Sequence, residues 1–244
     1  YPDPRNYGEI SVTRVLQKSS QVGVTKIALD LGHEPIWEVF NRFGIGQSPG
    51  TGFPGESAGE LPNRPRWYAT EKVSLAFGYG ITATPLQLAN AYTVFANGGV
   101  QRPISLLALE GEVPAGKRVI SRATSIQILN MLHAVTSDDG TARRARVPGY
   151  RVGGKTGTVH KVGPSGYEKH KYVALFAGIA PVDNPRIVTV VVINDPQGER
   201  YGGGAVAAPV FSEITNDALR ILNIPPTEIG SVEVAATIEQ GGPA

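Results

Sequence analysis

Three strand-like segments near the end of the chain constrain its fold more than any other feature. Residues 152–161, 171–180 and 186–194 are rich in Val, Ile, Thr, Tyr and Phe, a composition typical of β-strands. The turn sequence Pro-Val-Asp-Asn-Pro joins the last two segments and favours an antiparallel hairpin. Because these strands follow one another without an intervening helix, the pattern argues against alternating strand–helix units and predicts an α+β fold.

Helical patterns precede the strands, and one follows them. Residues 44–70 contain six glycines and four prolines, so we expect an irregular connector there. Thr84 and Ser121 are candidate N-caps, and Pro85 suits the first helical position. We expect helices over residues 9–18, 22–31, 36–43, 85–97, 121–135 and 209–222, and a polar loop over 160–171.

These segments predict one large folded unit. Residues 1–224 would form an antiparallel sheet packed with helices. Residues 225–244 are small, polar and interrupted by proline and glycine, so we expect a disordered tail.

Composition excludes several classes of function. The net charge is only +2 and no basic run is interleaved with aromatic residues, so a nucleic-acid partner is not expected. The absence of cysteine rules out disulfides and thiolate metal sites. His160 and His170 could pair at a metal, but no carboxylate spacing supports such a site. We therefore predict neither a metal nor a cofactor.

Residues 149–161 carry the motif with the most direct chemical meaning. Gly149, Gly154, Lys155 and Thr156 satisfy the pattern G-x-x-x-x-G-K-[ST] of nucleotide-binding P-loops. A P-loop requires a helix after its Lys-Thr pair, because the helix N-terminus holds the phosphates. The ten residues that follow Thr156 include three glycines and a proline, which disfavour a helix. We therefore expect Lys155 on a strand and rank nucleotide binding as the least favoured function.

The same lysine belongs to a second pattern. The triplets Ser19-Ser20-Gln21 and Lys155-Thr156-Gly157 resemble the S-x-N and K-T-G motifs of penicillin-recognising serine enzymes. The segments YGEISVTRVLQKSS, GTGFPGE, AFGYGITATPLQLANAY, FANGG, GGKTGT and KYVALFAGIAP also resemble, in this order, class B penicillin-binding proteins, above all their division-associated members. The resemblance covers about residues 1–225. It implies a serine β-lactamase/transpeptidase-like fold that is incomplete at its N-terminus, with residues 1–224 as the C-terminal portion of the transpeptidase domain and a helical subdomain beside the sheet. In the family the N-terminal portion contributes further strands to the sheet. This chain would then leave a sheet edge without partners, so alone it is expected to aggregate or to be unstable.

Two departures from the family pattern qualify this resemblance. The family nucleophile lies in an S-x-x-K motif, but no serine of this chain is followed by lysine three residues later. We expect the nucleophile to belong to an upstream segment, so that this chain alone is inactive; a naturally inactive homologue is the alternative. The second departure is Gln21, which replaces asparagine. Its carboxamide keeps the same hydrogen-bonding groups on a longer and less rigid side chain, so turnover or antibiotic affinity is expected to differ.

The resemblance implies acyl transfer on stem peptides that end in D-alanyl-D-alanine, through a covalent acyl-enzyme that a neighbouring amine resolves into a cross-link. β-Lactams would mimic the peptide end. Ser19 and Lys155 are the implied catalytic residues: Ser19 would pass a proton to the departing amine, and Lys155 would supply positive charge. The implied substrate-binding residues are Ser20, Gln21, Thr156, Gly157 and Thr158.

Each substrate-binding residue has an implied role. Gln21 would bind the peptide amide, and Thr156 and Thr158 would offer hydroxyls to the terminal carboxylate. The backbone N–H of Thr158 would stabilise the oxyanion, and Gly157 would leave room for the peptide. A simpler alternative is that Ser19 and Ser20 only cap the helix that follows them.

Family membership also implies partners and a location. The implied partners are stem peptides, β-lactams, the N-terminal portion of the same protein, a membrane glycosyltransferase and other division proteins. The implied location is the periplasm, with an inner-membrane anchor outside this chain. A non-catalytic module that binds cell-wall peptides or regulates a partner enzyme is the main alternative function.

Overall fold

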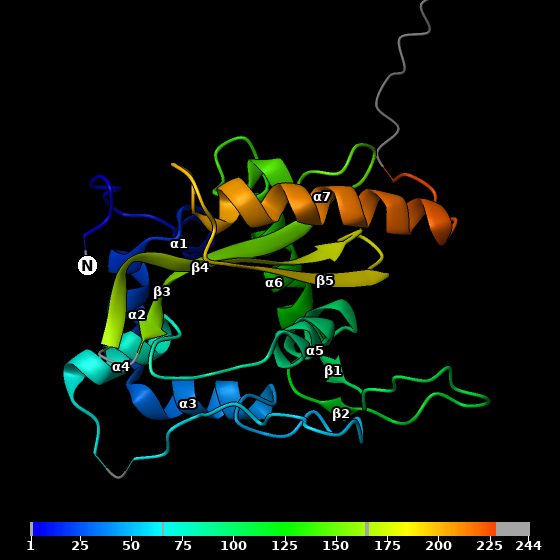
Figure 1. The fold of residues 1–244 in the computed structure, drawn as a ribbon, viewed down its shortest axis with the longest axis horizontal. Coiled ribbons are helices and arrows are strands. Elements are labelled where there is room, and N and C mark those ends of the chain that lie inside the picture. Colours follow the sequence, from blue (N-terminus) through cyan, green and yellow to red (C-terminus); the bar gives the residue numbers. More distant parts are fainter. Residues whose placement is uncertain (1, 65, 164–165, 228–244) are drawn as a thin grey trace, which may run out of the picture.

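A three-stranded antiparallel sheet, as far as the described residues show, organises the fold (Figure 1). The computed structural model describes residues 2–64, 66–163 and 166–227. The strands β3 (Gly153–Gly163), β4 (Gly166–Ala180) and β5 (Ile187–Asn194) lie in the order β3-β4-β5. The register places Lys155 opposite Ala177, and Leu175 between Gly157 and Val192. The predicted α+β fold and the antiparallel hairpin are confirmed.

The strands β3 and β4 extend further than the sequence suggested. The expectation of a polar loop over residues 160–171 is wrong, because both strands continue into this region, with a register shift between His160 and Val162. One cross-strand contact supports the extension, because the rings of His160 on β3 and Tyr172 on β4 lie 4.7 Å apart. Within β4, Lys171 also forms a 2.7 Å ion pair with Glu168, three residues earlier on the same strand.

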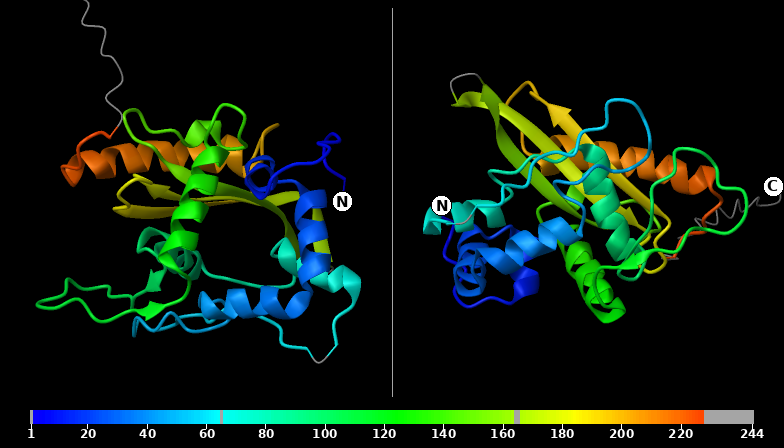
Figure 2. Two further views of the ribbon diagram at one scale, coloured as in Figure 1. Left: turned by 180° about the vertical axis from the view of Figure 1, so that it is seen from behind. Right: turned by 90° about the horizontal axis from the view of Figure 1, so that it is seen from below.

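Helices cover both faces of the sheet. Figures 1 and 2 show α7 (Gly203–Ile221) along one face and α5 (Pro85–Ala96) with α6 (Arg122–Val135) on the other. Thr84 and Ser121 cap α5 and α6 as expected, since their side chains accept hydrogen bonds from Gln87 N and Thr124 N. The core between α7 and the sheet contains Phe176 and Phe211, which are fully buried with ring centroids 4.8 Å apart.

The remaining helices form the helical subdomain at one end of the sheet. The helices α1 (Val12–Lys18), α2 (Gln21–Leu31) and α3 (His33–Arg42) are close to their predicted ranges. Helix α4 (Ala69–Ala76) was not predicted, because it begins where the glycine- and proline-rich connector ends. Glu71 caps its first turn by accepting a 2.9 Å hydrogen bond from Tyr68 N. The short strands β1 (Val100–Gln101) and β2 (Lys117–Arg118) pair at the base of a projecting loop (Figure 2).

Helix α7 begins six residues before Pro209, the residue expected to open it. Proline has no N–H, so within the helix it leaves the carbonyl of Ala205 without its usual partner. The Arg144 guanidinium donates a 3.0 Å hydrogen bond to that carbonyl from the short 3₁₀ turn at Arg143–Ala145. A side chain from outside the helix therefore completes its interrupted hydrogen-bond ladder.

We expect replacement of Arg144 by methionine to lower the free energy of unfolding by about 1 kcal/mol, because the Ala205 carbonyl loses its donor. A domain of this size should then melt at a temperature about 2–4 °C lower. Arg143→Met is the matched control, since the Arg143 side chain is 70% exposed and, among the described residues, its one ion pair is with Asp138 at 3.5 Å. Equal melting temperatures for Arg144→Met and the wild type would show that the carbonyl needs no donor.

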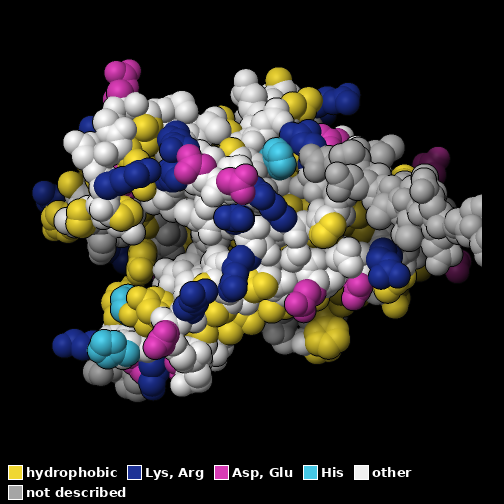
Figure 3. Space-filling view, turned by 90° about the horizontal axis from the view of Figure 1, so that it is seen from above, with side chains coloured by type: hydrophobic (Ala, Val, Ile, Leu, Met, Phe, Trp, Pro, Cys, Tyr) yellow, Lys and Arg dark blue, Asp and Glu magenta, His cyan; other side chains and the backbone are white. Residues whose placement is uncertain are grey.

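The outer sheet edge, the C-terminal tail and the surface charge were also subjects of expectations from the sequence. Within the described residues, the outer edge of β5 has no strand partner. Of the tail expected over 225–244, residues 228–244 lie outside the described residues, whereas Thr227 N donates a 2.9 Å hydrogen bond to Gly149 O. None of the helices in the described part of the chain is long and apolar enough to cross a membrane. In Figure 3, basic side chains are interspersed with acidic ones over the face that carries α7.

Candidate active site

Ser19 and Lys155 are 136 residues apart in sequence, yet their side chains meet. The Lys155 ammonium donates a 2.5 Å hydrogen bond to the Ser19 hydroxyl oxygen and a 3.1 Å hydrogen bond to the carbonyl of Thr156. Lys155 lies on β3 and not at the start of a helix. The predicted placement of Lys155 on a strand that faces Ser19 is confirmed, and the P-loop geometry is absent from this described segment.

The backbone at Ser19 has an uncommon conformation. Helix α1 ends at Ser19, which adopts φ 52° and ψ 44° in the left-handed region. Few residues other than glycine occupy this region, and those that do often lie at functional sites. The N–H groups of Ser19 and Ser20 donate to the carbonyls of Leu16 and Val15, at 3.2 and 2.9 Å. This tight end of α1 directs the Ser19 side chain toward β3.

Ser20 is committed to the helix that follows. Its side chain is buried at 3% exposure, accepts a 2.9 Å hydrogen bond from Gly23 N and donates a 2.5 Å hydrogen bond to Asp3. The other carboxylate oxygen of Asp3 accepts from Gln21 N at 2.7 Å. Of the two adjacent serines, only Ser19 therefore faces Lys155, while Ser20 caps α2. Gln21 is exposed at the first position of α2.

Thr156 and Thr158 lie on one side of β3, because alternate residues of a strand share a face. The Thr158 hydroxyl oxygen accepts a 3.0 Å hydrogen bond from Gly203 N, at the N-terminus of α7. The hydroxyl oxygen of Thr156 lies 3.3 Å from that of Thr141. The Thr158 hydroxyl thus lies beside the positive end of a 19-residue helix, which favours a negatively charged group.

Glycines allow α7 to approach β3 this closely. A Cβ at position 203 would overlap the carbonyl oxygens of Leu175 and Gly157. A Cβ at position 157 would lie 2.8 Å from the Cγ of Leu175, closer than side chains tolerate. The structure therefore explains Gly157 by packing inside the protein. Its role in making room for a peptide stays a prediction.

Burial changes the titration of the central lysine. Removal from water disfavours the charged ammonium and lowers the pKa of Lys155 to about 8. A lysine of lowered pKa beside a serine hydroxyl is an arrangement suited to proton transfer, because such a lysine can lose or regain its proton near physiological pH.

An aromatic region lies further along β3. The His160 ring lies tilted against Tyr172, at 39° between planes, and Tyr172 stacks with Tyr201 at a ring distance of 3.9 Å and 9° between planes. Nearby, Tyr79 contacts Tyr167 edge-on, and a cavity of about 580 Å³ is lined by Trp67 and both of these tyrosines. No sequence motif identified this region, and its signal in the sequence was the number of aromatic residues flanking the K-T-G strand. No group of three or more potential metal ligands occurs in the described part of the chain.

An antiparallel sheet enclosed by helices, with a helix-end serine facing the lysine of a K-T-G strand, is typical of proteins that recognise penicillin. The chain belongs to the penicillin binding protein transpeptidase domain family, which matches residues 1–216. The resemblance to class B penicillin-binding proteins is therefore confirmed.

The names of individual relatives are consistent with this family. The chain is 43% identical to peptidoglycan D,D-transpeptidase FtsI of Escherichia coli K12, over 92% of this chain and 38% of that protein. It is 39% identical to the probable peptidoglycan D,D-transpeptidase PenA of Neisseria gonorrhoeae, over 93% of this chain and 39% of that protein. The apo transpeptidase domain of Burkholderia pseudomallei penicillin-binding protein 3 superposes with a TM-score of 0.87 at 42% identity, covering 93% of this chain and 69% of that one. The chain thus spans about two fifths of the length of these curated relatives.

Proposed function

We propose that the whole protein is a peptidoglycan D,D-transpeptidase and that this chain supplies two of its three catalytic motifs. The observation that carries the proposal is the 2.5 Å contact between Lys155 and Ser19 in a member of this family. Relatives from two genera are named as peptidoglycan D,D-transpeptidases. The third motif, S-x-x-K, does not occur in these 244 residues, so the proposal assigns the nucleophilic serine to a segment outside them.

The proposed reaction has two steps. The nucleophilic serine attacks the carbonyl of the penultimate D-alanine, the peptide bond breaks, and D-alanine leaves with a proton on its amine. An amine of a neighbouring stem peptide then attacks the acyl-enzyme, loses a proton and releases the serine. Ser19 is suited to deliver the proton to the leaving amine, because its hydroxyl can draw on the Lys155 ammonium 2.5 Å away.

The substrate carboxylate would bind beside Thr156 and Thr158. Three favourable features converge there: two hydroxyls, the Lys155 charge and the positive end of α7. The backbone N–H of Thr158 is proposed as an oxyanion donor. Ser20 contributes indirectly in this scheme, because its capping bonds hold the start of α2 and thereby Gln21, which is proposed to bind the peptide amide.

The remaining family properties belong to the same proposal. They are reaction with β-lactams, a periplasmic location with a membrane anchor outside this chain, and association with a membrane glycosyltransferase and other division proteins. The unpaired outer edge of β5, as seen in the described residues, supports docking of another part of the same protein, because an exposed edge offers a row of unpaired backbone groups.

Fluorescent penicillin tests this function in the full-length protein. We expect a covalent label that survives denaturation and disappears when the serine of the S-x-x-K motif is replaced by alanine. Residues 1–244 alone should not be labelled. A full-length protein that stays unlabelled would overturn the proposal and favour a non-catalytic module that binds cell-wall peptides.

A further inference from the structure

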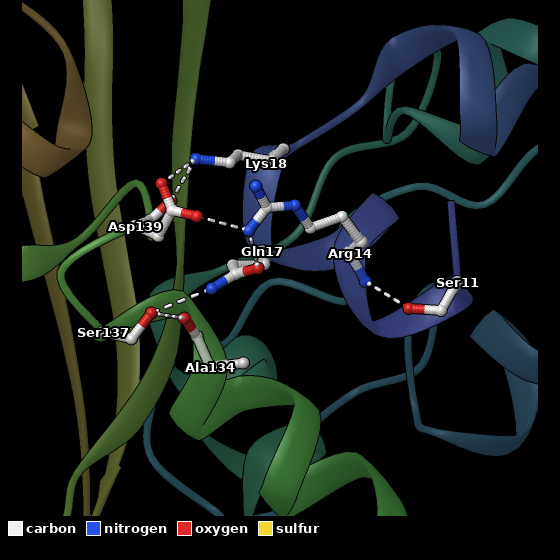
Figure 4. Close-up of polar contacts among 7 residues, drawn as sticks. All are labelled: Ser11, Arg14, Gln17, Lys18, Ala134, Ser137 and Asp139. Carbon is white, nitrogen blue, oxygen red and sulfur yellow. Dashed lines mark hydrogen bonds and ion pairs between the residues drawn. The ribbon is translucent and has the colours of Figure 1, made fainter. Parts of the chain in front are cut away.

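The helix that carries Ser19 has little hydrophobic anchorage in this chain. None of the seven residues of α1 is buried, and only Leu16 packs partly against the neighbouring cores. Its polar side chains, in contrast, form several hydrogen bonds with the loop that follows α6 (Figure 4). The orientation of α1 therefore depends on polar groups more than on core packing.

Asp139 is the centre of these contacts. One of its carboxylate oxygens accepts from Arg14 at 2.6 Å, and the other accepts from Lys18 at 2.8 Å. Lys18 also donates to the backbone carbonyl of Asp139 at 2.5 Å, and Gln17 donates to Ser137 at 2.9 Å. Figure 4 shows Arg14 and Lys18 converging on Asp139 from α1. One carboxylate thus holds both cationic side chains of the helix.

This arrangement differs from an ordinary exposed ion pair, which contributes little to the stability of a protein. Asp139 is 60% exposed, but the Lys18 side chain is only 13% exposed. Hydrogen bonds from Lys18 and Arg14 lower the pKa of Asp139 to about 2, so the carboxylate stays charged at neutral pH. Lys18 directly precedes Ser19, so the bond that fixes Lys18 also fixes the end of α1.

The same loop contacts the K-T-G strand. Thr141 follows Asp139 by two residues, and its hydroxyl oxygen lies 3.3 Å from that of Thr156. The loop is itself held in place, because Ala142 N donates to Val135 O at 3.0 Å and Arg146 Nε donates to Thr136 O at 2.8 Å. Residues 136–142 therefore connect the helix of Ser19 to the strand of Lys155.

We propose that Asp139 is a positioning residue: by holding Arg14 and Lys18, it sets the separation between the Ser19 hydroxyl and the Lys155 ammonium. The inference rests on the proposed transpeptidase function. Without the carboxylate, α1 keeps its sequence but loses the contacts that align its end with β3. Because a misplacement of about 1 Å can cost about a hundredfold in rate, we expect a fall of about tenfold in the acylation rate constant.

The test is Asp139→Asn in the full-length protein, with fluorescent penicillin at several concentrations. It yields the acylation rate constant, the dissociation constant of the non-covalent complex and the fraction of protein finally labelled. We expect the rate constant to fall about tenfold while the labelled fraction stays that of the wild type. Loss of folding alone would instead lower the labelled fraction and leave the rate constant of the folded molecules unchanged, which would contradict the inference.

Asp138→Asn is the matched control. Asp138 is the adjacent residue and contacts Arg143 and Arg146 rather than α1. The acylation rate constant of Asp138→Asn should therefore stay at the wild-type value. Asp139→Glu, which retains a carboxylate, should recover part of the lost rate. Lys18→Met provides a second variant should Asp139→Asn fold poorly, and the double variant should be no slower than the slower single one.

The outcomes separate the two proposals. A wild-type protein that is not labelled would overturn the transpeptidase function itself. A wild-type protein that is labelled, together with Asp139→Asn and Lys18→Met variants that react at the wild-type rate, would overturn only the role of Asp139.

Discussion

Replacement of Lys155 by methionine in the full-length protein should slow acylation by penicillin by about 10²–10³-fold, the typical cost of removing one preorganised charge-stabilising donor. The ammonium donates to Ser19 at 2.5 Å and lies beside the hydroxyls expected to bind the substrate carboxylate. Methionine retains the length and the apolar stem of lysine, so the fold should persist. Stopped-flow measurement of the acylation rate constant checks this prediction. An unchanged rate constant would remove Lys155 from the mechanism.

The same variant should be more stable than the wild type at neutral pH. Burial lowers the pKa of Lys155 from 10.5 to about 8, so the folded state disfavours the ammonium that the unfolded chain carries freely. Removing the charged group should raise the free energy of unfolding by about 1–3 kcal/mol at pH 7, the upper value corresponding to the full pKa shift.

The sign of the pH dependence follows from proton binding. Between pH 8 and 10.5 the unfolded state binds more protons at this lysine than the folded state does. The free energy of unfolding of the wild type therefore increases as the pH rises through this range. The free-energy cost of burying the charged Lys155 ammonium is fully present below pH 8 and disappears above pH 10.5. The difference in melting temperature between Lys155→Met and the wild type should therefore shrink as the pH rises through this window. A difference that stays constant would show that Lys155 titrates normally.

Replacement of Ser19 by alanine should lower the acylation rate constant by about 10²-fold or more, because the leaving group loses its proton donor. The cost in stability should be small, since Ser19 is exposed and Lys155 keeps its bond to the Thr156 carbonyl. The measured quantities are the acylation rate constant and the melting temperature.

Ser11→Ala is the control on the same helix. Ser11 caps the other end of α1 through a 3.2 Å hydrogen bond from Arg14 N, so its loss should cost about 1 kcal/mol of stability. The acylation rate constant should stay near the wild-type value. If Ser11→Ala and Ser19→Ala slow acylation equally, the effect arises from the helix and not from the Ser19 hydroxyl.

The sequence predicted the parts of the site that depend on local patterns. The β-branched residues of 152–161 and the glycines after Thr156 placed Lys155 on a strand, and the two motif triplets paired it with Ser19. Substrate binding by Ser20 stays a prediction; its side chain also forms hydrogen bonds with Asp3 and Gly23 in the cap of α2, the simpler role considered for this serine. Adjacent serines have the same side chain, so the sequence does not show which of the two faces Lys155. The left-handed backbone conformation at Ser19 points the two side chains in different directions.

Contacts between distant segments escaped prediction. Asp139 lies 121 residues from Lys18, and no local pattern marks it as the partner of α1. The start of α7 was missed because the glycines at 202–204 have poor helix propensity, while their small size lets the helix approach β3. Pro209 suggested a helix start, although Arg144 compensates for its missing N–H inside the helix. In each case a tertiary contact outweighed the local preference.

The most direct test of the account is turnover of a stem peptide that ends in D-alanyl-D-alanine, in the presence of an acceptor peptide with a free amine. With the full-length protein, mass spectrometry should detect D-alanine and an equal amount of the cross-linked peptide dimer. Both products should form at least about a hundredfold more slowly in Ser19→Ala and Lys155→Met. Binding of the stem peptide or of penicillin without release of D-alanine would contradict the account and identify a protein that recognises the cell wall without catalysing its cross-linking.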